Sequence, residues 1–218
     1  MTKVRNTPSP TPKSQPPLQL EVTKDFFQVL QKRHSIRKYK SYDIPDSDLE
    51  KILQAARLAP STNNSQSWRF IVVRDPETIK LLSQPSQQRF IANANAIIVV
   101  LGERQSSCCP GNQARWHLQD PMIATEHLVL AATALGYGTC WVAAYESRSV
   151  EFIQRIKTEL EIPENADIIV LVAIGVPDEH PSSRSRKALE EIAFDGKYGI
   201  PWSVTNQEDE SRSHASAI

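Results

Sequence analysis

Apolar residues recur along the chain with two periods, one typical of helices and one typical of strands. After Pro45, four apolar residues keep the i, i+3, i+4, i+7 spacing of an amphipathic helix, namely Leu49, Ile52, Leu53 and Ala56. We expect Ser47 and Glu50 to form a capping box at its start and Pro60 to end it. The same pattern predicts helices over residues 25–32, 76–82, 120–135 and 150–160.

Short, strongly apolar runs predict strands over residues 68–73, 96–102, 139–145 and 168–175. The helix predicted over residues 120–135 is apolar around most of its circumference, which is typical of a helix packed centrally in the fold or against another subunit. Few consecutive elements match a right-handed crossover series, and no G-x-G-x-x-G follows a strand, so a Rossmann dinucleotide site is not supported. The pattern predicts an α+β domain with one central sheet flanked by helices.

The two ends of the chain are polar and predict little packing. The first 20 residues are rich in Pro, Ser, Thr and Gln, so we interpret residues 1–22 as a disordered N-terminal tail. Residues 204–218 are interpreted as a flexible C-terminal tail, which leaves residues 23–203 as one domain. Alternatively, either tail could be an arm that clasps a second subunit.

The charge and cysteine content of the chain argue against several classes of function. The 25 basic and 25 acidic residues give a net charge of +0, which argues against a surface for nucleic acid. No run approaches 18 apolar residues, and the N-terminus shows no apolar signal segment, so we expect no membrane span and no secretion. Cys108, Cys109 and Cys140 lack a zinc spacing and are expected to be free thiols. We therefore expect a cytoplasmic protein.

Two polar stretches just outside predicted helices carry the candidate chemistry. Arg33 and Arg37 flank Ser35, and guanidinium forks with a hydroxyl group suit a phosphate. The second stretch is neutral and follows Pro60, with Ser61, Thr62, Asn63, Asn64 and Gln66. Such groups suit a planar heterocycle better than a metal. Each stretch alone is also ordinary loop composition, but together they predict a phosphorylated, ring-bearing cofactor.

Four motifs, in order, resemble those of the nitroreductase family of FMN-dependent oxidoreductases. They are RHSIRKY, AARLAPSTNNSQSWRFIVV, LAATALGYGTCWV and RSRKALEEI, and the resemblance extends from about Phe26 to Tyr198. It implies a nitroreductase-like fold with a central mixed β-sheet flanked by helices. It also implies FMN as the cofactor and an intertwined homodimer with each flavin site at the subunit interface.

The resemblance also implies roles for the charged residues. Arg33 and Ser35 would contact the phosphate and the ribityl chain, while Arg184 and Arg186 would close over the phosphate. Arg37 would lie near the pyrimidine edge of the ring, where a positive charge stabilises the anionic reduced flavin. Without the resemblance, the segment from Arg184 to Lys187 is better interpreted as a solvated basic loop.

For the uncharged residues, the resemblance implies contacts with the ring. The loop that reaches the cofactor from the other subunit would contain Pro60, Ser61, Thr62 and Asn64. The backbone against the reactive edge would be that of Val142, Ala143 and Ala144. Gln88 would add a further ring contact, and His34, inside the first motif, could contribute its backbone alone. Trp141 could border the substrate, although core packing is its expected fate.

Hydride transfer at flavin N5 requires no catalytic triad, carboxylate pair or metal ligand set, and none stands out in the sequence. The resemblance implies a ping-pong cycle in which NAD(P)H reduces the flavin and a nitroaromatic, quinone or similar acceptor then takes the hydride.

Departures from the family pattern leave the subfamily open. Ser67 occupies the place of a proline that is common in the family, and the Glu, Tyr and Lys trio of the dehalogenating branch is not apparent. Two alternatives remain. One is a flavin-fragmenting or dehydrogenating branch of the same superfamily, and the other is a flavin-binding sensor module without efficient turnover.

Overall fold

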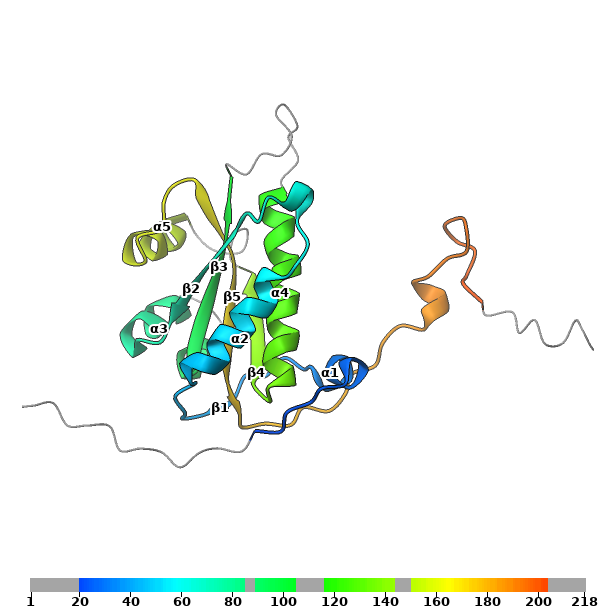
Figure 1. Cartoon of the computed structure of the whole chain (residues 1–218), viewed down its shortest axis with the longest axis horizontal. Helices are drawn as coiled ribbons and strands as arrows, with labels where there is room; N and C mark the ends of the chain where they lie inside the picture. The colour runs from blue at the N-terminus through cyan, green and yellow to red at the C-terminus, as the bar shows by residue number, and fades with distance from the viewer. Residues whose placement is uncertain (1–19, 85–88, 105–115, 144–149, 204–218) are drawn as a thin grey trace, which may run out of the picture. The chain divides into compact units, whose positions relative to one another are not determined.

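The structure is a computed structural model that describes residues 20–84, 89–104, 116–143 and 150–203 (Figure 1). The chain divides into two compact units, residues 1–181 and 182–218. The first unit contains the sheet and its helices. The second contains, among its described residues, the 3-10 helix η3 (Leu189–Glu191) and a bridge between Phe194 and Pro201. The division into one domain over residues 23–203 with a tail at each end stays a prediction.

A five-stranded sheet forms the centre of the first unit. Its longest strand, β5 (Ala166–Pro177), pairs with β3 (Ala96–Glu103), and β3 pairs with β2 (Trp68–Val73). On the edge of β5 opposite β3 lies β4 (Gly138–Ala143), and the short β1 (Tyr39–Lys40) pairs with the end of β5.

The expected helix-flanked central sheet of an α+β fold is confirmed. All pairings between these strands are antiparallel. Parallel pairing among the described residues is found at one isolated bridge, between Ser35 and Thr139, so the sheet is less mixed than expected.

Helices cover both faces of this sheet (Figure 1). Strand β3 shows why, because alternate residues of a strand point to opposite faces. Ile98 and Val100 pack in a core with α2 (Asp46–Arg57) and α4 (Trp116–Ala134). Ile97 and Val99 pack in a second core with α3 (Pro76–Ser83) and α5 (Val150–Glu159). With both faces covered, the strand is apolar throughout.

The remaining elements are short: α1 (Phe26–Lys32), η1 (Thr62–Asn64) and η2 (Arg89–Asn93). None of the helices within the described ranges is long and apolar enough to cross a bilayer.

The predicted helices and strands are present with shifts of one to four residues at their ends, but the capping box is wrong. Helix α2 begins at Asp46 with Pro45 as its N-cap and without a side-chain capping bond. Ser47 therefore lies inside the first turn, where Asp46 and Asp48 supply the negative charge that a helix start favours. Helix α4 begins at Trp116, earlier than predicted, and includes Pro121.

Candidate functional site

The segment that contains Arg33, Ser35 and Arg37 runs alongside the start of β4. Helix α1 ends at Arg33, whose N–H donates to the Val29 carbonyl oxygen at 2.9 Å. The N–H of Ile36 then donates to the Thr139 carbonyl oxygen, also at 2.9 Å. Gly138 permits this close approach, because a Cβ atom there would lie 2.7 Å from the Ile36 side chain.

Cys140, a buried free thiol, lies on β4 next to Thr139, which bridges Ser35. Burial raises the pKa of this thiol, whereas the charges of Arg37 and Arg33 and a hydrogen bond with Ser35 act to lower it. Arg33, Ser35 and Arg37 occupy alternate positions of the extended segment beside β4, so the hydroxyl group and the two guanidinium groups that were predicted to bind a phosphate and its ribityl chain lie on one side of it.

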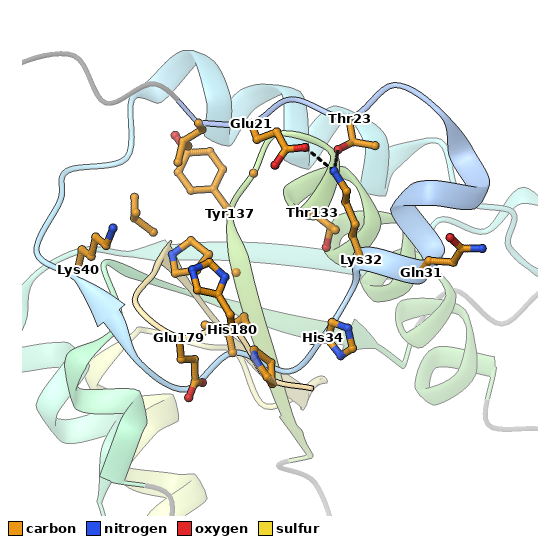
Figure 2. Close-up of a pocket in the computed structure, with 17 residues that line it drawn as sticks. Glu21, Thr23, Gln31, Lys32, His34, Lys40, Thr133, Tyr137, Glu179 and His180 are labelled. Atoms are coloured by element: carbon orange, nitrogen blue, oxygen red, sulfur yellow. Dashed lines mark hydrogen bonds and ion pairs between the residues drawn. The ribbon is translucent and has the colours of Figure 1, made fainter. Parts of the chain in front are cut away.

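His34 lines a different space. With Ile36, it borders a cavity of about 560 Å³ to which Arg33, Ser35 and Arg37 do not contribute (Figure 2). Lys32 lines the same cavity and forms an ion pair with Glu21 at 2.5 Å (Figure 2). Because side chains alternate along an extended segment, the His34 imidazole is directed away from the arginine side. Any contact of His34 with a cofactor beside Ser35 must therefore use its backbone.

The backbone at Arg37 is held by a residue that follows the end of β5. The Glu179 carboxylate accepts hydrogen bonds from the N–H of Arg37 at 2.5 Å and of Lys38 at 3.2 Å. The Arg37 guanidinium lies over the ring of Phe90, 5.7 Å from its centroid, within the range of a cation–π contact. The Arg37 side chain is exposed and its backbone is held, which suits a residue that meets a ligand.

The loop after Pro60 is held by its own hydroxyl groups and by Asp120 on α4. Asp120 accepts hydrogen bonds from the Thr62 N–H at 3.1 Å, the Thr62 hydroxyl at 3.3 Å and the Ser65 hydroxyl at 3.2 Å. The Ser61 hydroxyl accepts from the Gln66 N–H at 3.0 Å. The predicted ligand groups of Ser61 and Thr62 are therefore engaged inside the protein.

The amide side chains of this loop are exposed instead. Asn63, Asn64 and Gln66 adopt positive φ angles of 49°, 56° and 47°, and all three are exposed. The Gln66 amide donates to the Asn64 side-chain oxygen at 3.2 Å. Among the predicted contacts of this loop, Asn64 and the exposed Pro60 are thus the ones that face outward.

From Cys140 to Ala143, buried and exposed side chains alternate along strand β4. Cys140 and Val142 are buried, whereas Trp141, at 46% exposure, and Ala143 are exposed. The expectation that Trp141 packs in the core is wrong for this chain, because the strand alternation places it on the open face. Ala144 and Gln88, both predicted contacts, lie outside the described residues, as do Cys108 and Cys109.

The two polar stretches lie near opposite ends of α4 (Figure 1). The loop after Pro60 bonds to Asp120 near the start of the helix. At the other end, the Thr23 N–H just before α1 donates to the Ala134 carbonyl oxygen at 2.8 Å. A rise of about 1.5 Å per residue puts roughly 21 Å of helix axis between Asp120 and Ala134. Folding of one copy therefore does not bring the two stretches together.

Arg184 and Arg186 belong to the second unit, where both are exposed. The Arg186 guanidinium donates to the Arg184 carbonyl oxygen at 3.3 Å. Their approach to the phosphate beside Arg33 stays a prediction.

Asp120 is the residue that sequence reasoning missed. It is a carboxylate that is only 3% exposed, in a helix whose other buried residues are uncharged. An acidic residue that opens an apolar helical pattern was a visible signal. However, its partners lie 55 and 58 residues away in the sequence.

Comparisons with known proteins give a consistent result. Residues 30–86 and 77–176 match the model described as the Nitroreductase family. A relative from Archaeoglobus fulgidus, named for NADH dehydrogenase and NAD(P)H nitroreductase activities, is 39% identical over 156 residues, which are 71% of this chain and 87% of that protein. An NADH dehydrogenase from Thermus thermophilus is 30% identical over 194 residues, covering 75% of this chain and 92% of that protein. Among solved structures, an FMN-dependent nitroreductase from Clostridium difficile has a TM-score of 0.70 and 29% identity, covering 79% of this chain and 99% of that one.

Proposed function

The chain belongs to the nitroreductase family, and from this premise we propose that it is an FMN-dependent oxidoreductase that uses NAD(P)H to reduce nitroaromatic, quinone or similar electron-poor acceptors. The observation that carries the proposal is the position of Arg33, Ser35 and Arg37 on one extended segment alongside β4. The names of the Archaeoglobus and Clostridium relatives support NAD(P)H as the reductant and FMN as the cofactor.

The donor set beside β4 fits a phosphorylated flavin. Arg33 and the Ser35 hydroxyl offer charge-assisted and neutral hydrogen bonds to the phosphate and the ribityl chain. Arg184 and Arg186 would complete the phosphate site. Arg37, with its backbone anchored by Glu179, would place a positive charge at the pyrimidine edge of the ring. FMN, when bound, supplies hydride chemistry at N5, and the protein supplies binding, orientation and electrostatics.

The loop after Pro60 would reach this flavin from a second copy of the chain. Within one copy, α4 keeps the loop away from Arg33, so a site with both stretches requires two copies. Exposed apolar side chains support such an interface, since Phe26 and Phe27 on α1 are 58% and 71% exposed and Trp141 on β4 is 46% exposed. We infer an intertwined homodimer with a flavin site at each end of its interface.

The exposed face of β4 would form the floor of the substrate space. Ala143 is small and leaves room for a flat molecule, and Trp141 on the same face would border it. We infer that NAD(P)H and the acceptor use this same space in turn, the first leaving before the second binds. This order of events is a ping-pong cycle.

The proposal is tested first by the absorption spectrum of the purified protein with FMN. We expect a yellow protein that bleaches anaerobically with NADPH or NADH and regains its colour when a quinone or nitroaromatic is added. A protein that stays colourless after incubation with FMN contradicts the proposal. Loss of intact flavin during aerobic turnover would indicate the flavin-fragmenting branch, and turnover no faster than that of free FMN would indicate a sensor.

A further inference from the structure

We propose that Asp120 is the positioning residue of the flavin loop, and that it sets the loop conformation in which three amide side chains meet the flavin ring, namely those of Asn63, Asn64 and Gln66. The inference rests on the proposed function and deepens it, because it assigns the ring contacts to amides and their placement to a buried carboxylate. Asp120 itself contacts the loop and not the flavin.

The hydrogen bonds of Asp120 are directed to the loop. A carboxylate that is 3% exposed requires hydrogen-bond donors in place of water. Its donors among the described residues are the Thr62 N–H, the Thr62 hydroxyl and the Ser65 hydroxyl, at 3.1 to 3.3 Å. Hydrogen bonds to an ionised acceptor are stronger than neutral ones. The carboxylate therefore fixes the loop on both sides of Asn63 and Asn64.

The loop needs such an anchor because its backbone is strained. Asn63, Asn64 and Gln66 occupy the left-handed region, which asparagine tolerates better than other non-glycine residues but which is unfavourable for Gln66 without surrounding contacts. The Ser61 hydroxyl closes the loop through its bond to the Gln66 N–H. Because the hydroxyl groups of Ser61, Thr62 and Ser65 all form hydrogen bonds within the protein, the amides are the groups left facing outward.

Asp120 is itself fixed to the sheet through the first turns of α4. Pro121 has no N–H to donate to the His117 carbonyl oxygen. That oxygen lies directly against β3, where a Cβ atom on Gly102 would be only 1.9 Å from it. The buried Thr125 hydroxyl donates to the Pro121 carbonyl oxygen at 2.8 Å. The loop is thereby attached to the rigid centre of the fold, which is what a precise binding site requires.

The first experiment compares Asp120→Asn, which keeps the side-chain volume, with Glu126→Gln, which neutralises an exposed carboxylate on the same helix. The dissociation constants of FMN and of riboflavin are measured for each variant. We expect Asp120→Asn to raise both constants by the same factor, about tenfold, because the loop acts on the ring that the two ligands share. Glu126→Gln should leave both unchanged.

The second experiment uses Ser65→Ala, alone and combined with Asp120→Asn. Ser65→Ala should raise both dissociation constants in the wild-type background and have little effect in the Asp120→Asn background, because both substitutions remove the same contact. If Asp120→Asn does not fold, Ser65→Ala alone is the test. A rise in both dissociation constants supports the proposal, and unchanged constants overturn it.

Other outcomes overturn the inference. They are unchanged flavin affinity in folded Asp120→Asn, a lower unfolding temperature without any change in affinity, an effect on FMN but not on riboflavin, or independent effects of the two substitutions. A wild-type protein that binds neither flavin overturns the proposed function as well, so the two failures are distinguishable.

Discussion

The two stretches assigned to the flavin site are built in opposite ways. The segment from Arg33 to Arg37 is extended, its backbone is bonded to Thr139 and Glu179, and its side chains include two arginines that we propose bind the cofactor. The loop after Pro60 is neutral and left-handed, and its hydroxyl groups are used to attach it to Asp120. The proposed role of the first stretch therefore depends on charged residues that are evident in the sequence. The second depends on a distant residue that sets its shape.

The largest expected effect is that of Arg33→Ala on FMN affinity. Removal of a charge-assisted phosphate contact should cost about 1.5–3 kcal/mol, which corresponds to a rise of roughly 10- to 100-fold in the dissociation constant. Riboflavin, which lacks the phosphate, should bind nearly as before. Fluorescence titration with both ligands measures this, with Arg155→Ala on the exposed face of α5 as the control. Equal losses of affinity for FMN and for riboflavin would contradict the assignment of Arg33 to the phosphate.

A smaller effect is expected for Asn64→Ala, which removes a neutral amide from the loop. One neutral hydrogen bond contributes about 0.5–1.5 kcal/mol, so both FMN and riboflavin should bind roughly 2- to 10-fold more weakly. The matched control is Asn93→Ala, in the 3-10 helix η2. A loss of affinity for FMN but not for riboflavin would indicate that Asn64 contacts the phosphate and not the ring.

The smallest effect is expected on stability and concerns Asp167, which belongs to neither stretch. Burial acts to raise the pKa of Asp167, but the hydrogen bond and positive charge of Arg104 outweigh it and hold that pKa below its ordinary value. The stabilisation is therefore complete above the unfolded pKa of about 3.9 and is lost as the pH falls through the lower folded value.

Asp167→Asn tests this sign. Urea unfolding of the variant and of wild type is measured at pH 7 and at pH 3. At pH 7 the variant should have the lower free energy of unfolding, and at pH 3 this difference between the two proteins should be smaller. A difference that grows in acid would contradict the sign of the pKa shift. FMN affinity measured at pH 7 should not change.

Most of the fold could be predicted from periodicity. Leu49, Ile52 and Ala56 bury the face of α2 that their spacing predicts, and β2 spans the predicted residues 68–73. The capping box failed because Ser47 and Glu50 match a local pattern, whereas Pro45 sets where the chain can first turn into a helix. Local patterns predict elements well and their ends less well.

The site could be predicted only in part. Arg33, Ser35 and Arg37 lie on one extended segment beside β4, and their contacts with a flavin stay a prediction. For the loop, composition predicted the candidate residues but not which of their side chains are exposed. Ser61 and Thr62 are turned inward by contacts with Gln66 and Asp120. Those contacts depend on tertiary packing, and one of the partners lies 58 residues away in the sequence.

The most direct measurement is an FMN titration of mixed dimers in which one copy carries Arg33→Ala and the other carries Asn64→Ala. If each site takes Arg33 from one copy and Asn64 from its partner, each mixed dimer holds one intact site and one doubly substituted site. The account predicts that half of the sites bind FMN with wild-type affinity. Two classes of weakened sites, one with the dissociation constant of Arg33→Ala and one with that of Asn64→Ala, with no site at the wild-type dissociation constant, would contradict it.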